Sequence, residues 1–181
     1  MQWRNHRSTA KGLAAGAIGG LAATWIMGYA QTAFHKVAGE LAHAGGNGSP
    51  APQRPHMPAA EDEPATVKAA VAIARAAGRD LAPERREAAG SLVHYAYGTL
   101  IGAAYGAAAE HSDLPRTASG AAFGSALWLL ADEVAVPALK LARPARDYPA
   151  EVHAVALCSH LAYSVTTELI RRALRAGVLA R

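Results

Sequence analysis

The stretch GLAAGAIGGLAATWIMG at residues 12–28 carries a small residue at every fourth position and contains no formal charge. In water, a glycine in a helix interior costs about 1 kcal/mol relative to alanine, so regularly spaced glycines are a poor way to build a soluble helix. In a bilayer, small residues four apart let two helix backbones approach closely. The same spacing recurs twice later in the chain. The glycines predicted to pack helices together are Gly12, Gly16, Gly20, Gly28, Gly98, Gly102, Gly106, Gly120 and Gly124.

This stretch belongs to the first of four apolar segments that reach the length of about 18 residues that suggests a membrane span. They cover about residues 12–35, 88–109, 117–139 and 152–170, and the first two contain no Asp, Glu, Lys or Arg. We therefore predict an all-α fold: a polytopic membrane protein with four transmembrane helices, forming a single membrane domain over residues 1–181. A soluble four-helix protein is the main alternative, but its helices would carry a charged stripe that the first two segments lack.

The first apolar segment also has features of a cleaved signal peptide. Basic residues precede it, and Gly28-Tyr29-Ala30 resembles an Ala-x-Ala cleavage site. The segment is nevertheless long and glycine-periodic rather than leucine-rich, so we expect it to be retained as a helix.

A polar extramembrane connection over residues 36–87 separates the first two apolar segments. Its first part is rich in Gly and Pro and is expected to be irregular. Residues 66–77 then place Val67, Val71 and Ala74 on one face of a helix. This predicts a short amphipathic helix that either lies at the membrane interface or packs on the bundle.

The net charge of +4 and the isoelectric point near 9.5 do not indicate nucleic-acid binding. The basic residues flank the apolar segments, and no aromatic-rich basic face accompanies them. The expected partners are the lipid bilayer and either a second copy of the chain or another membrane protein. The short ends are dense in arginine, which favours a cytoplasmic position for both termini. The single cysteine, Cys158, excludes an intrachain disulfide.

Polar residues inside the predicted spans are candidates for a functional site, because such groups are costly in lipid. On helices they form a stripe on each of the last three spans, and turning the stripes inwards gives a shared polar interior. The stripe residues are His94 and Tyr97 in the second span, Asp132 in the third, and His153, His160 and Glu168 in the fourth.

Three uses of this interior follow from the residue types. Hydrogen bonds between the helices would make it structural, which we favour. Alternatively, Asp132, Glu168 and the histidines could relay protons, or His94, His153 and His160 could bind haem or a metal ion. The chain has no Gly-rich phosphate loop, Cys-x-x-Cys, His-Glu-x-x-His or nucleophile elbow. We therefore predict that the protein is not an enzyme and has no cofactor, with haem or metal as the alternative.

Three motifs in the second half of the chain resemble the YagU-like family of small bacterial inner-membrane proteins. They are HYAYG followed by GAAYG at residues 94–106, GAAFGSALW running into Ala131-Asp132-Glu133 at residues 120–133, and SHLAY with ELIRR at residues 159–172. The resemblance covers residues 90–175, more weakly residues 12–34, and leaves out the connection at 36–87. It implies an integral inner-membrane protein with a loose link to acid-stress tolerance. The motif positions are His94, Asp132, Glu133, His160, Tyr163 and Glu168, which adds Glu133 and Tyr163 to the candidate site.

Overall fold

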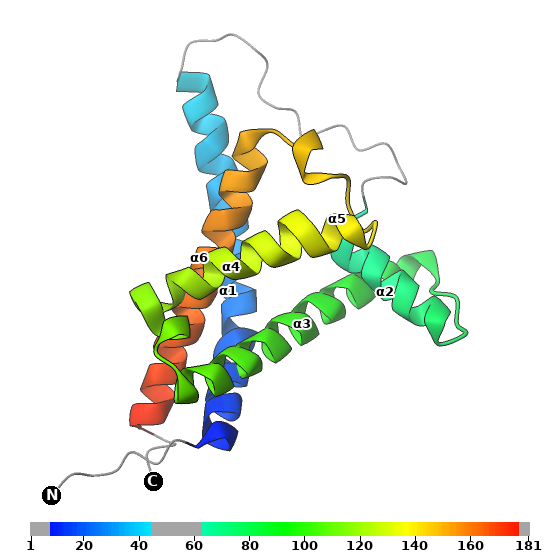
Figure 1. The fold of residues 1–181 in the computed structure, drawn as a ribbon. Helices are drawn as coiled ribbons and strands as arrows, with labels where there is room; N and C mark the ends of the chain where they lie inside the picture. Colours follow the sequence, from blue (N-terminus) through cyan, green and yellow to red (C-terminus); the bar gives the residue numbers. More distant parts are fainter. Residues whose placement is uncertain (1–7, 45–62, 178–181) are drawn as a thin grey trace, which may run out of the picture. The chain divides into compact units, whose positions relative to one another are not determined.

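In a computed structural model the chain is helical, and no strand occurs in the residues that the structure describes, 8–44 and 63–177 (Figure 1). The elements in chain order are α1 (Thr9–Ala44), α2 (Ala65–Ala76), α3 (Pro83–His111), a 3-10 segment (Leu114–Gly120), α4 (Ala121–Trp128), a π-helical segment (Leu129–Ala135), α5 (Val136–Ala138), a second 3-10 segment (Ala145–Asp147) and α6 (Ala150–Ala176). The predicted all-α class is confirmed. The Gly- and Pro-rich part of the connection, residues 45–62, lies outside the described residues.

Two helical stretches of the described residues are long and apolar enough to cross a membrane, Thr9–Val37 and Leu114–Ala138. They qualify by length and composition, a test that a signal sequence or the core helix of a soluble protein also passes. Helices α3 and α6 cover the other two predicted spans, and their crossing of a membrane remains a prediction.

The third predicted span is not helical from its start. Thr117 has an extended ψ of 135°, and Ala118 and Ser119 have φ values of 50° and 55°, followed by Gly120 at 90°. Positive φ lies in the left-handed region, which breaks a right-handed helix and is strain-free only for glycine. The expectation of a helix from residue 117 is therefore wrong for four residues, and the α-helix begins at Ala121. Hydropathy alone does not register such a break.

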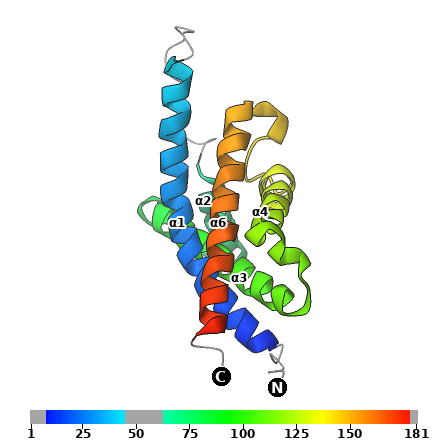
Figure 2. The same ribbon diagram turned by 90° about the vertical axis from the view of Figure 1, so that its left-hand side faces the viewer.

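The described residues form two compact units. The first contains α1 up to Met27, α3 from Tyr95, the segment that follows as far as Leu127, and α6 from His160. The second contains the described parts of residues 28–94 and 128–159. In the first unit, the parts of α1, α3 and α6 lie close to one another (Figures 1 and 2).

Helices α1 and α3 meet backbone to backbone in the first unit. A Cβ atom added to Gly102 would lie 2.6 Å from the Cα of Gly20, and one added to Gly20 would lie 2.8 Å from the Cα of Gly102. One turn away, Gly16 and Gly106 stand in the same relation, at 2.8 Å in both directions. A side chain at any of these four positions would force the two backbones to shift apart. The order of the contacts makes the two helices antiparallel.

Helix α6 packs on the same unit through other glycines. A Cβ at Gly19 would lie 2.8 Å from the carbonyl oxygen of Thr167, a contact that the four-residue spacing did not single out. Added Cβ atoms at Gly120 and Gly124 would lie 2.9 Å and 2.7 Å from carbonyl oxygens of α6. At Gly28, by contrast, an added Cβ meets nothing within 4 Å, so its predicted packing role remains a prediction.

In the second unit, α2 packs against the first turns of α3. Val67 and Ala70 are buried, and a Cβ at Gly90 would lie 3.0 Å from the Cα of Val67. Arg86 of α3 also lies 3.4 Å from Glu63, just before α2. The predicted amphipathic helix is therefore present, and its apolar face is covered by α3.

Candidate functional site

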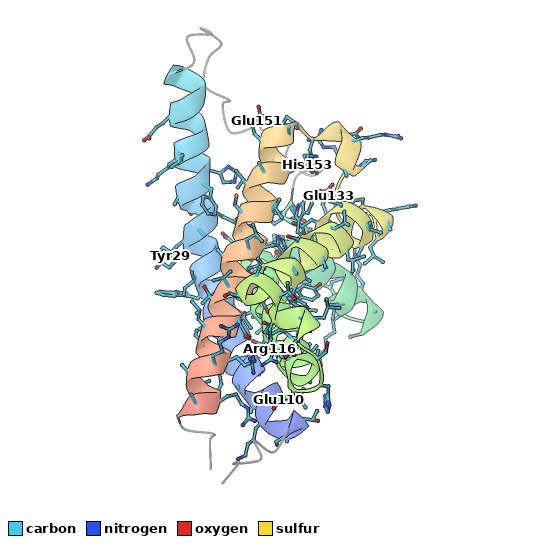
Figure 3. The ribbon with its side chains drawn as sticks, turned by 60° about the vertical axis from the view of Figure 1, so that its left-hand side comes forward. Tyr29, Glu110, Arg116, Glu133, Glu151 and His153 are labelled. Carbon is cyan, nitrogen blue, oxygen red and sulfur yellow. The ribbon has the colours of Figure 1, made fainter. Side chains whose placement is uncertain are left out.

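Two of the predicted site residues meet in the second unit. The Nδ1 atom of His153, on α6, lies 2.5 Å from Oε1 of Glu133, in the π-helical segment (Figure 3). The Nε2 atom of the same ring lies 3.1 Å from the carbonyl oxygen of Ala145. A carbonyl only accepts, so Nε2 donates, and the contact on the other side needs a second proton between imidazole and carboxylate. The pair is therefore either an imidazolium with a carboxylate or a neutral imidazole with a carboxylic acid.

The most buried predicted residue, Glu168, lies at the centre of a second cluster, in the first unit. Its exposed fraction is 0%, and three side chains donate hydrogen bonds to its carboxylate. Tyr105 donates at 2.8 Å, Arg171 at 2.6 and 3.0 Å, and Arg172 at 2.6 Å. A carboxylate is tolerated in such surroundings only when it is paired and hydrogen-bonded, and this one is satisfied on both oxygens.

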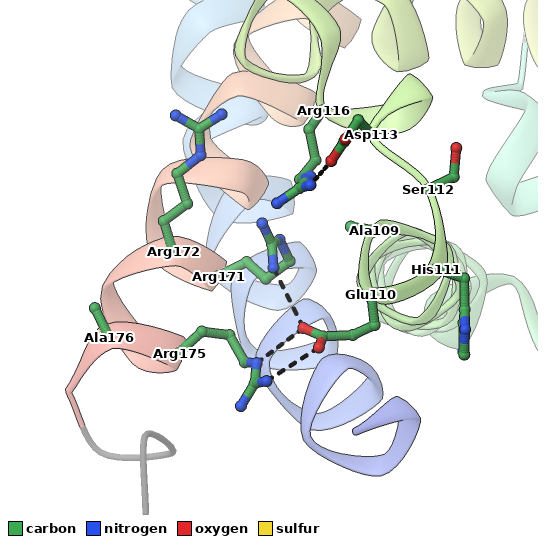
Figure 4. A pocket seen from close by; sticks show the side chains of 10 residues that line it. All are labelled: Ala109, Glu110, His111, Ser112, Asp113, Arg116, Arg171, Arg172, Arg175 and Ala176. Carbon is green, nitrogen blue, oxygen red and sulfur yellow. Dashed lines mark hydrogen bonds and ion pairs between the residues drawn. The ribbon is translucent and has the colours of Figure 1, made fainter. Parts of the chain in front are cut away.

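A second carboxylate, Glu110 at the end of α3, continues the cluster. Arg175 donates two hydrogen bonds to it, at 2.8 and 3.0 Å, in the forked geometry of a strong guanidinium–carboxylate pair (Figure 4). Nη1 of Arg171 lies 3.5 Å from the same carboxylate, so Arg171 bridges the two acids. The side chains of Arg171 and Glu110 are only 5% and 8% exposed. We call Tyr105, Glu110, Glu168, Arg171, Arg172 and Arg175 the charged cluster.

A pocket of about 450 Å³ opens beside the charged cluster (Figure 4). Four arginines line it: Arg116, Arg171, Arg172 and Arg175. Its acidic lining consists of Glu110 and Asp113, and Asp113 forms an ion pair with Arg116. The Nε atom of Arg116 is buried and has no hydrogen-bond partner. The lining of the pocket therefore carries more arginines than carboxylates.

A family model for proteins of unknown function, DUF1440, matches residues 48–169, about two thirds of the chain. The chain belongs to the DUF1440 family. The match takes in much of the connection at 36–87, which the motif resemblance had left out. Comparisons with curated proteins and with solved structures gave no significant match. The YagU-like relationship itself remains a prediction.

The other predicted site residues of this DUF1440 protein have more ordinary surroundings. The hydroxyl of Tyr163 donates a hydrogen bond of 2.6 Å to the carbonyl of Gly98, which ties α6 to α3. His160 is buried and its backbone lies against Gly124, while His94 and Asp132 are half-buried. Tyr97 is 47% exposed.

A metal site built from His94, His153 and His160 gains no support. Across residues 8–44 and 63–177, no group of three or more His, Cys, Asp or Glu side chains could hold a metal ion.

Most of the charged cluster was not singled out from the sequence. The arginines at 171, 172 and 175 were interpreted as cations next to the membrane, and the first two also as part of the ELIRR motif. Their spacing from Glu168, three, four and seven residues along α6, does place all four on one helix face. That signal could have found the α6 part of the cluster. Nothing in the sequence indicates that Glu110, 65 residues away, pairs with Arg175.

The Glu110 carboxylate gives the cluster a defined pH dependence. Burial alone would raise its pKa, but the hydrogen bonds and charge of Arg175, with the charge of Arg171, outweigh burial and hold the pKa below its ordinary value of 4.5. A carboxylate whose pKa is lower in the folded state than in the unfolded state stabilises the fold. This stabilisation is complete above the unfolded-state pKa, and it is lost as the pH falls through the folded-state pKa.

We therefore expect Glu110→Gln to lower the free energy of unfolding by about 1.5–3 kcal/mol at neutral pH. The difference from the wild-type protein should shrink below pH 4.5, as the wild-type carboxylate also becomes neutral. Unfolding of detergent-solubilised protein, followed by circular dichroism across this range, measures it. A deficit that stays constant into strong acid would contradict the assignment.

Proposed function

We propose that this DUF1440 protein is a multi-pass protein of the bacterial inner membrane with four spans and a structural or accessory role. It would have no catalytic chemistry of its own. Both termini would lie in the cytoplasm. The link to acid or envelope stress rests on the YagU-like resemblance alone.

The observation that carries the proposal is the distribution of polarity. In the first unit, Ser164, Thr167 and Glu168 are fully or almost fully buried. Large apolar side chains face outward instead, with Trp25 56% and Leu100 69% exposed. A soluble protein buries its large apolar residues and exposes its charges. Lipid tails would solvate the outward face and leave the small and polar residues to hold the helices together.

The α1–α3 contact supports the same proposal. Helices in a bilayer gain little from apolar burial against one another, so their association depends on close backbone packing and hydrogen bonds. Gly16, Gly20, Gly102 and Gly106 supply such packing within one chain. Since these glycine faces are already occupied by each other, we propose that association with a second copy or a membrane partner uses the outward apolar faces.

A proton pathway is less well supported. The buried carboxylates of Glu110 and Glu168 are each held by guanidinium groups, an arrangement suited to fixed charges. A proton carrier needs a carboxylate that can become neutral without stranding a buried cation. The contact between His153 and Glu133 lies in the second unit, and the charged cluster lies in the first.

The number of spans can be tested by cysteine labelling in spheroplasts, in a Cys158→Ala background. With four spans, cysteines introduced by Arg79→Cys and Ser112→Cys lie on opposite sides of the membrane. We expect an impermeant maleimide to label the first in intact spheroplasts and the second only after permeabilisation. If only Thr9–Val37 and Leu114–Ala138 cross, both cysteines lie on the same side and label together.

A control on the same membranes tests whether the protein is integral at all. Washing with alkaline carbonate strips peripheral proteins and leaves spanning helices in place. Retention in the pellet supports the proposal, whereas release into the supernatant contradicts it whatever the labelling pattern.

A further inference from the structure

We propose that the arginine-lined pocket beside the charged cluster binds a singly charged phosphate group, from a phospholipid headgroup or from free inorganic phosphate. The recognition does not depend on the proposed function. Only the choice of lipid as the source rests on it.

The charge balance of the region favours an anion. Four guanidinium groups line the pocket, at residues 116, 171, 172 and 175. Three carboxylates pair with them: Glu110, Asp113 and Glu168. Among the residues that the structure describes, four positive charges against three negative charges leave one positive charge in a partly enclosed space. One phosphodiester or one phosphate monoanion would neutralise it.

The arginines differ in how fully they are engaged. Arg171 and Arg175 donate hydrogen bonds to the buried carboxylates of Glu168 and Glu110, and these bonds hold the two arginines in place in the lining of the pocket. Arg116 has a buried Nε without a partner, and its one ion pair is with Asp113, whose side chain is 89% exposed. Arg172 gives its Nε to Glu168, and its side chain is 49% exposed. The side chains of Arg116 and Arg172 are 38% and 49% exposed, so their outer guanidinium nitrogens are the ones that a ligand can reach.

Two of the arginines reach the pocket from different elements. Figure 4 shows the side chains of Arg116 and Arg171 extending toward each other, from the 3-10 segment and from α6. Like charges in a partly buried space repel, and an anion between them removes that repulsion. The planar fork of arginine matches the oxygens of phosphate, which accept two parallel hydrogen bonds.

The position and size of the pocket fit a headgroup. It lies where α3 ends at His111 and where α6 nears its end at Ala176. If these helices span, their ends lie at the depth of the lipid phosphates, where arginine is favoured. A volume of about 450 Å³ accommodates a glycerophosphate group as well as a free phosphate ion.

The test compares ligands that differ in the phosphate. In native mass spectrometry of the detergent-solubilised chain, we expect phosphatidylglycerol to remain bound where diacylglycerol, which lacks the phosphate, does not. In a second arm, the melting temperature is measured in sodium phosphate and in sodium chloride at equal ionic strength. A rise in phosphate alone indicates that the free ion binds.

Arg116→Gln is the diagnostic variant, because the Arg116 side chain forms no ion pair with the buried carboxylates of Glu110 and Glu168 among the described contacts. We expect about tenfold weaker binding of the phosphate-bearing ligand and an unchanged melting temperature in chloride. Asp113→Asn removes the carboxylate that competes for Arg116 and should strengthen binding. Arg146→Gln removes a cation whose side chain is 86% exposed, in the second unit, and should have no effect.

Retention of phosphatidylglycerol alone identifies a lipid site, and a response to phosphate alone identifies a free-ion site. A response in both arms supports recognition of the phosphate group itself. Failure in both arms overturns the proposal, as does equal binding by Arg116→Gln and the wild-type chain. If Arg116→Gln does not fold, Asp113→Asn decides, since binding no stronger than wild type contradicts the role of Arg116. Phosphate binding by a chain that carbonate releases from membranes would leave this inference standing and remove the proposed function.

Discussion

Glu168→Ala is expected to lower the free energy of unfolding by about 3–5 kcal/mol, because it strands a buried guanidinium. The side chain of Arg171 is 5% exposed, so water cannot replace the lost hydrogen bonds, and only the 3.5 Å contact with Glu110 is left. The Tyr105 hydroxyl, buried in the same place, loses its acceptor as well. Circular dichroism during denaturation of the detergent-solubilised protein measures the loss.

The matched control is Arg172→Gln, which removes another hydrogen bond to the same carboxylate. The Arg172 side chain is 49% exposed, so water can replace its hydrogen bond to Glu168. We therefore expect the free energy of unfolding to fall by less than about 1 kcal/mol. Combining Glu168→Ala with Arg171→Met should recover part of the stability, because the stranded charge is gone. Equal losses for Glu168→Ala and Arg172→Gln would show that the Glu168 carboxylate is not buried as described.

The charged cluster shows which parts of a site can be predicted from a sequence. Glu168 stood out because a lone acid inside an apolar segment has to be explained by a partner. Its contacts with Arg171 and Arg172 are local, three and four residues away, and follow from helix geometry. The Glu110–Arg175 pair depends on how α3 and α6 pack, and no local pattern encodes that. The same holds for the hydrogen bond between Tyr105 and Glu168, which lie 63 residues apart in the sequence.

The glycines give a similar lesson for the fold. Their spacing indicates a helix face that tolerates close approach, but the face is equally suited to any partner. The sequence did not indicate that Gly16 and Gly20 lie against Gly102 and Gly106 of the same chain. It also did not distinguish Gly120, where the backbone is left-handed, from a helical glycine. The spacing of the glycines describes the surface of one helix, whereas the pairing of two helices depends on the surfaces of both.

Gly102→Ala is expected to destabilise the protein by about 1–3 kcal/mol, and Gly102→Val by more, because any Cβ at this position lies 2.6 Å from the backbone of Gly20. Backbone atoms cannot rotate away as a side chain can, so α1 and α3 must separate. The separation would also weaken the packing of Gly16 against Gly106 on the neighbouring turn. Denaturation of the purified variants measures the effect.

Gly28→Ala makes the same chemical change in α1, where the added Cβ meets nothing within 4 Å. There only helix propensity acts, and alanine should be more stable than glycine by up to about 1 kcal/mol. The two substitutions therefore have opposite expected signs for one physical reason, the presence or absence of a facing backbone. If Gly102→Ala also stabilised the protein, α1 and α3 would not be in contact at that turn. The glycine spacing would then have to be explained by a partner outside the chain.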